Sequence, residues 1–238
     1  MKAVIIAGGQ GRRLLPHTKD KPKCLMTVHE KPILEYQFEA LRHVGITDIA
    51  IVSGHCHDLL KTYTAQYNHP VTFIENTDFA DTNNAYGIWL AKEFVADDPE
   101  GFLLINSDLV FPPEMLAFLI DSKEKDCIII EKNTDPESDM VKIEMKGNDI
   151  IAMSKDIPPQ KTSAEAVGPV KFSQEGGALF MEYLESFVKK NERNHWFFYK
   201  LGDFARDHFF AGIYNPGFVW AEIDTYEDLQ LAHELINV

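Results

Sequence analysis

A glycine-rich turn follows directly on the first apolar segment of the chain. Residues 3–7 are β-branched or small and predict a buried first strand, and glycines stand at positions 8, 9 and 11. Such glycines let the backbone turn tightly and bring its N–H groups close to a bound phosphate. The basic residues around the turn are Arg12, Arg13, Lys21 and Lys23. A basic, glycine-rich turn after a first strand is typical of an α/β protein that binds a polyphosphate.

Two familiar phosphate-binding loops do not fit this turn. The dinucleotide-binding pattern needs a third glycine three residues after the second, and position 14 is a leucine. The P-loop ends in Gly-Lys-Ser or Gly-Lys-Thr, and Arg12-Arg13 stands there instead. The sequence therefore excludes a dehydrogenase and indicates another class of nucleotide site.

Strand-like and helix-like segments alternate through the first half of the chain. We expect strands over residues 3–7, 48–53, 71–74 and 102–106, and helices over residues 32–44, 58–67 and 83–94. Repeated strand–helix–strand units imply a Rossmann-like, mostly parallel sheet with helices on both faces. Ligands bind such sheets at the carboxyl ends of the strands, where the glycine turn, Asn76-Thr77 and Asn106-Ser107-Asp108 are expected.

The pattern changes after the strand expected over residues 127–131. Residues 140–145 and 150–154 flank Gly147-Asn148 and predict an antiparallel hairpin, followed by a proline-containing loop over 155–162. Later strands are expected over 167–172 and 219–223, and helices over 173–190, 203–210 and 225–235. The prediction is one α/β domain of residues 1–238 with a small antiparallel subregion in its second half.

Composition and charge limit the partners. With 238 residues and 45% apolar content, the chain can bury one substantial core. The net charge of −14 argues against nucleic-acid or anionic-membrane binding, while positive charge gathers in residues 12–23. No apolar run approaches the ~20 residues of a membrane span, and the N-terminus lacks a signal-peptide layout. The three scattered cysteines suggest no disulfide or zinc site, so we expect a cytoplasmic protein without membrane insertion.

Three acidic residues are candidates for a metal site. Asp108 follows an apolar strand, and Glu222 and Asp224 stand two apart in the last expected strand, where period-two alternation places them on one face. Carboxylate oxygens are ligands that Mg²⁺ prefers, so Mg²⁺ is the expected cofactor. Asp224 has an alternative role as a helix cap, because Asp-Thr before a helix is a common helix start.

The motifs resemble those of the nucleotidyltransferases that make activated sugars and alcohols. Residues 8–16, Gly-Gly-Gln-Gly-Arg-Arg-Leu-Leu-Pro, and 22–25, Pro-Lys-Cys-Leu, are similar to the family's G-G-x-G-x-R-L-x-P and P-K-x-L. Residues 75–90 and 220–229 look like the branch typified by CTP:phosphocholine cytidylyltransferase. The chain also resembles the 2-aminoethylphosphonate and related phosphonate cytidylyltransferases. Gly87 departs from this branch, where a small hydroxyl residue is common, so a hydrogen bond is expected to be missing.

The resemblance implies Mg²⁺-dependent transfer of CMP from CTP to a small phosphorylated or phosphonate acceptor, with release of pyrophosphate. It assigns residues 1–131 to the nucleotide and residues 132–238 to the acceptor and the closing strand and helix. By motif position, Arg13 would hold the triphosphate, and Lys23 would bridge the α-phosphate and the acceptor phosphate. The nucleotide contacts are expected from Ala7, Gly8, Gly9, Gly11, Arg12, Asn76, Thr82, Asn83, Asn84 and Ser107.

Candidate acceptor residues come from their chemistry. Trp196, Tyr199 and Trp220 offer aromatic faces to a cation, although the aromatic run at 196–199 is also typical of a core. Glu165 or Asp139 could meet an amine. Two other functions remain open: a sugar-1-phosphate nucleotidylyltransferase using GTP, UTP or dTTP, and a non-catalytic nucleotide-binding regulatory module. A homodimer also remains open.

Overall fold

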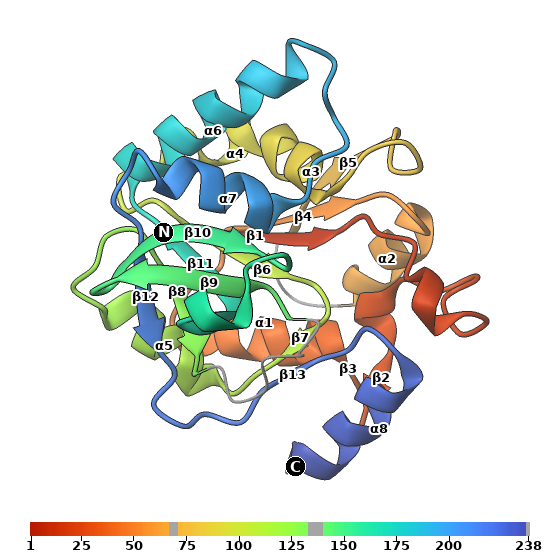
Figure 1. Ribbon diagram of the computed structural model, residues 1–238. Helices are drawn as coiled ribbons and strands as arrows, with labels where there is room; N and C mark the ends of the chain where they lie inside the picture. The colour runs from red at the N-terminus through yellow and green to blue at the C-terminus, as the bar shows by residue number, and fades with distance from the viewer. Residues whose placement is uncertain (67–70, 133–139, 237–238) are drawn as a thin grey trace.

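A computed structural model describes residues 1–66, 71–132 and 140–236 (Figure 1). Its described residues form a nine-stranded sheet in the order β5-β4-β1-β6-β11-β8-β12-β10-β9. The strands of this sheet are β1 (Lys2–Ala7), β4 (Ile49–Ser53), β5 (Val71–Glu75), β6 (Phe102–Asn106), β8 (Cys127–Glu131), β9 (Lys142–Lys146), β10 (Asp149–Ser154), β11 (Ala164–Phe172) and β12 (Ala211–Tyr214). Two small sheets pair β2 (Thr27–Val28) with β3 (Lys31–Pro32) and β7 (Leu109–Val110) with β13 (Ala221–Glu222).

The first four strands in this order run parallel, as the alternating pattern predicts. Val4 of β1 lies opposite Ala50 of β4 on one side and Leu104 of β6 on the other. From β11 onward the sheet is mixed, because β11 runs antiparallel to both β6 and β8 while β12 runs parallel to β8. The predicted hairpin is confirmed as β9 and β10, and it extends this same sheet.

Helices cover both faces of the sheet (Figure 1). They are α1 (Ile33–His43), α2 (His57–Thr64), α3 (Asn84–Leu90), α4 (Lys92–Val95), α5 (Pro113–Asp121), α6 (Gln174–Val188), α7 (Phe197–Ala205) and α8 (Tyr226–Leu235), with 3₁₀ turns η1 (Arg12–Leu14), η2 (Lys23–Leu25) and η3 (Pro159–Lys161). Successive side chains of a strand point to opposite faces. Ala3 and Ile5 accordingly pack with α1, α2 and α5, while Val4 packs with α3, α6 and α7. The resulting three-layer α/β/α arrangement confirms the expected fold class.

The structure corrects the expected helix over residues 203–210. The helix α7 begins at Phe197, inside the aromatic run, and ends at Ala205. Phe197, Leu201 and Phe204 recur at helical spacing and are all buried, so packing sets the start of this helix. The aromatic run is thus partly core, which is the alternative that the sequence left open.

Three other elements differ from expectation. The helix expected over residues 83–94 is divided at Ala91 into α3 and α4. The strand expected over residues 219–223 is reduced to β13, which pairs with β7 outside the main sheet. Tyr67, the expected end of the second helix, lies outside the described residues, and the structure ends α2 at Thr64.

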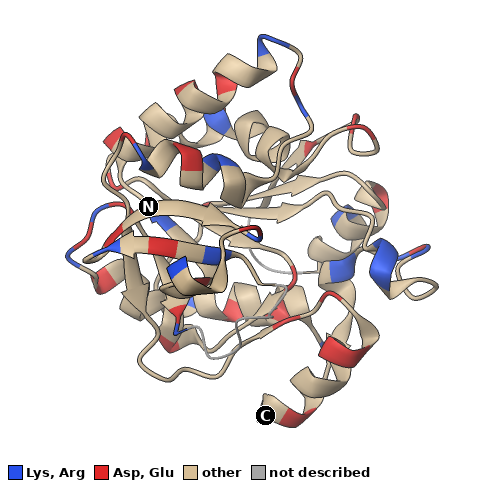
Figure 2. Cartoon of the chain, viewed as in Figure 1, with Lys and Arg blue, Asp and Glu red and all other residues tan. Residues whose placement is uncertain are grey.

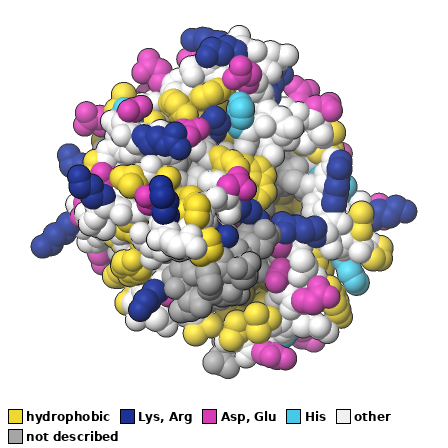
Figure 3. All heavy atoms as spheres, in the orientation of Figure 1, with side chains coloured by type: hydrophobic (Ala, Val, Ile, Leu, Met, Phe, Trp, Pro, Cys, Tyr) yellow, Lys and Arg dark blue, Asp and Glu magenta, His cyan; other side chains and the backbone are white. Residues whose placement is uncertain are grey.

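Charge and apolarity are unevenly distributed over this fold. Figure 2 shows several Lys and Arg residues close together on the loops that follow β1, while the other basic residues and the acidic residues are spread over the chain. On the face drawn in Figure 3, basic and acidic side chains otherwise lie interspersed among apolar ones. Within the described ranges, no helix is both long enough and apolar enough to cross a bilayer.

Candidate active site

A cavity of about 740 Å³ opens at the carboxyl ends of β1 and β6. The two halves of the chain both contribute to its walls, because loops after β1 and β6 meet residues of β11, α7 and α8 there. The predicted residues that line it are Ala7, Gly8, Gly9, Gly11, Arg12, Arg13, Lys23, Asn76, Thr82, Asn83, Asn84, Ser107, Asp108, Trp196, Trp220, Glu222 and Asp224. The structure therefore brings most of the predicted site into one cavity.

The glycine turn has the backbone conformation that its sequence predicts. Gly11 has φ 58°, in the left-handed region that favours glycine, and its carbonyl oxygen accepts a 2.7 Å hydrogen bond from Thr18 Oγ1. A side chain at position 11 would also crowd Thr18, whose Cγ2 lies 3.0 Å from the ideal Cβ position. The turn leads straight into η1, so Arg12 and Arg13 are held at the cavity wall.

The carboxylates of Asp108, Glu222 and Asp224 form an acidic cluster. One ligand oxygen from each lies within 4.8 Å of those of the other two. The cause is the pairing of β7 with β13, which sets Glu222 opposite Leu109, and the hydrogen bond from Ile223 N to Asp108 O at 3.0 Å. Residues more than 100 positions apart are thus joined by a two-stranded sheet that the sequence pattern did not reveal.

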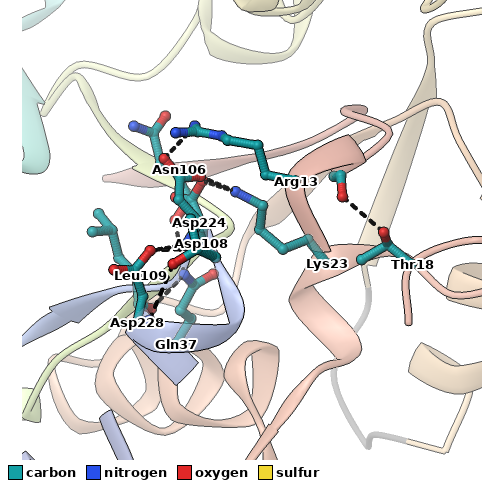
Figure 4. Close-up of polar contacts among 11 residues, drawn as sticks. Arg13, Thr18, Lys23, Gln37, Asn106, Asp108, Leu109, Asp224 and Asp228 are labelled. Carbon is teal, nitrogen blue, oxygen red and sulfur yellow. Dashed lines mark hydrogen bonds and ion pairs between the residues drawn. The ribbon is translucent and has the colours of Figure 1, made fainter. Parts of the chain in front are cut away.

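Two basic side chains reach into the acidic cluster (Figure 4). Lys23 Nζ donates a 3.0 Å hydrogen bond to Asp108 Oδ2 and also forms an ion pair with Asp224 Oδ1, and Arg13 pairs with the second carboxylate oxygen of Asp224. Burial alone would lower the pKa of Lys23, but the Asp108 and Asp224 carboxylates outweigh burial and raise that pKa above its ordinary value. Lys23 is therefore a fixed positive charge at neutral pH.

The acidic cluster fits a hard divalent cation. Burial, followed by the neighbouring charges of Asp108 and Asp224, raises the pKa of Glu222 to about 8. Asp108 Oδ1 is buried and has no hydrogen-bond partner among the described residues. An orphaned carboxylate oxygen and a carboxyl group crowded by two others both gain from a bound cation. The donor set of three carboxylates is one that Mg²⁺ accepts.

A hydrogen-bonded group surrounds the predicted nucleotide contacts. Asn76 Nδ2 donates to Thr82 Oγ1 at 2.9 Å, and Asn76 Oδ1 accepts from the backbone of Asp78 at 3.1 Å. Asn83 Oδ1 caps the start of α3 by accepting from Asn84 N at 2.9 Å, which confirms the capping role that its sequence position indicates. These bonds rigidify one wall of the cavity.

The predicted acceptor residues divide into two groups. Trp196 and Trp220 line the cavity, and Trp220 Nε1 lies 3.4 Å from Glu131 Oε2. Tyr199 lies beside the cavity without lining it; its ring stacks edge-on against Trp196 with centroids 5.8 Å apart. Glu165 lies in β11 opposite Glu131, also away from the lining, and Asp139 lies outside the described residues.

Two residues that the sequence reasoning missed support the site. Gln37 of α1 is fully buried and its Nε2 donates to Asn106 O at 2.8 Å and to Leu109 O at 2.9 Å, which holds the segment that carries Asp108. Lys155 lines the cavity, with Nζ 5.0 Å from the Trp196 ring centroid. A glutamine on the buried face of a predicted helix was the available signal for Gln37, whereas nothing local distinguished Lys155.

The fold, the basic glycine turn and the acidic cluster are together typical of an α/β enzyme that acts on a nucleoside triphosphate. The sequence profile of the MobA-like NTP transferase domain matches residues 3–175, and the chain belongs to that family. The resemblance to nucleotidyltransferases is thereby confirmed, and with it the assignment of the chain to this class of enzyme.

Individual relatives agree with this assignment. The CTP:phosphoglutamine cytidylyltransferase of Campylobacter jejuni is 29% identical over 253 residues, covering 98% of this chain and 100% of the relative. The choline-phosphate cytidylyltransferase of Streptococcus pneumoniae is 39% identical over 110 residues, covering 44% of this chain and 47% of the relative.

Solved structures share the fold. CTP:phosphocholine cytidylyltransferase from Streptococcus pneumoniae superposes with a TM-score of 0.76 at 22% identity, over 98% of this chain and 97% of the other. The inositol-1-phosphate CTP transferase of T. maritima gives a TM-score of 0.81 at 21% identity, over 97% of this chain and 94% of the other. At these identities, the likeness confirms the expected fold.

Proposed function

We propose that this chain is a Mg²⁺-dependent cytidylyltransferase that transfers CMP from CTP to a small phosphorylated or phosphonate acceptor. The observation that carries the proposal is the meeting of Lys23 and Arg13 with the Asp108, Glu222 and Asp224 carboxylates at one cavity. The relatives named above, which carry names of cytidylyltransferases for phosphoglutamine and choline phosphate, support CTP as the donor. A phosphate-bearing acceptor is common to those names.

The reaction joins two anions, so charge neutralisation and alignment are its main requirements. An acceptor phosphate oxygen attacks the α-phosphorus of CTP, the new P–O bond forms, and the bond to the bridging oxygen breaks to release pyrophosphate. Lys23 would bind the α-phosphate and the acceptor phosphate together, which reduces their repulsion. Arg13 would bind the β- and γ-phosphates and stabilise the leaving pyrophosphate.

The acidic cluster supplies the remaining charge balance. Asp108, Glu222 and Asp224 would hold Mg²⁺, which neutralises phosphate charge when bound. Lys23 and Arg13 are paired with two of these carboxylates, so the same carboxylates orient both basic side chains toward the cavity. The glycine turn and the polar group around Asn76 would hold the triphosphate and the nucleoside.

The proposal is tested by pyrophosphate release across a grid of CTP, UTP, GTP, ATP and dTTP against phosphoglutamine, phosphocholine, inositol 1-phosphate, 2-aminoethylphosphonate and mannose 1-phosphate. Acceptor-dependent release with CTP, lost in Asp108→Asn and kept in Asp97→Asn, supports it; Asp97 is exposed and serves as the matched control. Release with GTP and mannose 1-phosphate would favour the sugar-phosphate alternative. That alternative has a specific basis in a mannose-1-phosphate guanyltransferase of Gibberella zeae that is 32% identical over 155 residues.

A further inference from the structure

Several hydrogen bonds join the segment before α7 to the start of α3. Asn83 N donates to Arg193 O at 3.1 Å, and Ala85 N donates to His195 O at 3.3 Å. Between them, the side chain of Asn84 accepts a hydrogen bond from Phe197 N at 2.7 Å through Oδ1. Figure 1 shows this connection, where the loop that follows α6 runs down to α3 before α7 begins. The bonds tie the first half of the chain to the second beside the cavity.

The bond from Phe197 N to Asn84 is a helix cap supplied from another helix. Phe197 is the first residue of α7, and its N–H is one of those that a helix cannot satisfy internally. The N-cap residue, Trp196, makes no side-chain cap of its own. Asn84 Oδ1 therefore determines where α7 starts relative to α3.

The residues on either side of Phe197 both line the cavity. Trp196 and Phe198 belong to its wall, whereas the side chain of Phe197 is buried in the core at 1% exposure. Trp196 is 37% exposed, its ring contacts Tyr199 edge to face, and its backbone directly precedes the bonded N–H of Phe197. Fixing the backbone at Phe197 fixes both aromatic walls.

We propose that Asn84 is a positioning residue that sets Trp196 and Phe198 against the acceptor through its hydrogen bond to Phe197 N. This inference rests on the proposed function, because it assigns Trp196 and Phe198 to the acceptor side of the transfer reaction. Asn84 itself lines the cavity from the nucleotide side, so one residue couples the geometry of the two substrates.

The competing role for Asn84 is direct contact with the nucleotide, and the two roles use different atoms. Positioning needs Oδ1, which already accepts from Phe197 N. Nucleotide contact by donation needs the amide Nδ2, since Asn carries its donors there. Asn84→Asp keeps an acceptor oxygen and removes the donor, whereas Asn84→Ala removes both. The pair of variants therefore separates the roles.

The test measures amide hydrogen exchange at Phe197 and steady-state kinetics for Asn84→Ala, Asn84→Asp and the control Asn194→Ala. Asn194 accepts from Asn83 Nδ2 at 3.3 Å, so its truncation removes a neighbouring side-chain bond and leaves Phe197 N bonded. Kinetics use whichever of phosphoglutamine, phosphocholine and inositol 1-phosphate the wild-type protein turns over.

The positioning role predicts about tenfold faster exchange at Phe197 and about a tenfold higher acceptor KM in Asn84→Ala, the size expected for one lost hydrogen bond. The KM for CTP should change less in this variant. Asn84→Asp should restore both the exchange protection and the acceptor KM, and Asn194→Ala should match the wild type.

Two results would overturn the positioning role. One is an amide exchange rate at Phe197 that is the same in Asn84→Ala as in the wild type; this result does not depend on which acceptor the wild-type protein uses. The other is an Asn84→Asp variant as impaired toward the acceptor as Asn84→Ala. Absence of wild-type turnover, with Phe197 exchange that depends on Asn84, would instead count against the proposed function alone.

Discussion

Lys23 Nζ lies 3.0 Å from Asp108 Oδ2, and this contact joins a turn near the start of the chain to the loop that leaves β6. Lys23 also pairs with Asp224 beyond β13, so one ammonium group connects three separate segments. The side chains of Lys23 and Asp108 are 15% and 20% exposed, which limits screening by water. The charge of Lys23 is therefore well placed to act on a phosphate bound in the cavity.

We expect Lys23→Ala to lower kcat/KM for CTP by roughly 10²- to 10³-fold, because a preorganised charge in a partly dry site is lost. Lys19→Ala is the matched control, since Lys19 is an exposed lysine of the same basic segment. Circular dichroism checks that both variants fold. A Lys23→Ala enzyme within threefold of the wild type would contradict the role given to this residue.

The raised pKa of Glu222 predicts a stability that falls with rising pH in metal-free protein. Burial and the charges of Asp108 and Asp224 raise this pKa to about 8 from an ordinary value of 4.5, so the folded state binds the proton more tightly than the unfolded state. The contribution is fully present below pH 4.5 and is lost as pH rises through about 8.

The measurement is chemical denaturation with EDTA across this pH range, comparing the wild type with Glu222→Gln. The difference in unfolding free energy between them should change with pH by up to about 1.4 kcal/mol per unit, the limit for one proton. Added Mg²⁺ should weaken this dependence, because a cation favours the ionised carboxylate. A difference that is flat with pH would contradict the cause assigned to the shift.

Gln37 is expected to stabilise the proposed metal site by holding the backbone on either side of Asp108. Gln37→Leu removes the donor to Asn106 O and Leu109 O and leaves buried carbonyl groups without that partner. We expect a loss of about 1–3 kcal/mol in unfolding free energy and weaker Mn²⁺ binding by calorimetry. Gln66→Leu, at an exposed position, is the control. Unchanged Mn²⁺ affinity in a folded Gln37→Leu protein would contradict this role, because the segment that carries Asp108 would then keep its conformation without the Gln37 hydrogen bonds.

The three cysteines should differ sharply toward a thiol reagent. Burial raises the pKa of Cys24 to about 12 and that of Cys127 to about 11, and both side chains are fully buried. Cys56 is only half-buried, at the start of α2. At pH 8, reaction of the native protein with an aromatic disulfide reagent should therefore release about one equivalent of chromophore in a fast phase. The Cys56→Ser variant should show no fast phase. Two or more fast thiols in the native protein would contradict this burial.

The sequence predicted elements whose signals are local. Ser173 caps α6 by accepting from Gly176 N, and Thr225 with Asp228 forms the capping box that starts α8, so both helices begin where their residues indicate. The hairpin around Gly147 likewise follows from local turn chemistry.

Elements set by distant packing were missed. The start of α7 depends on Asn84 and on the core around Phe197, neither of which leaves a local pattern. Strand patterns indicated Asp108, Glu222 and Asp224 as metal candidates, but they did not predict the pairing of β7 with β13 that brings these residues together, because that pairing involves only four residues. Site chemistry was thus more predictable than the contacts that assemble it.

The central claim is transfer of CMP onto an acceptor phosphate, and phosphorus NMR of the complete reaction tests it most directly. With CTP, Mg²⁺ and each of phosphoglutamine, phosphocholine and inositol 1-phosphate, the account predicts paired signals of a new CDP-linked diphosphate together with free pyrophosphate in one mixture. Omission of that acceptor, or Asp108→Asn, should leave CTP intact. Conversion of CTP to CMP and pyrophosphate without a linked product, or to CDP and phosphate, would contradict the account.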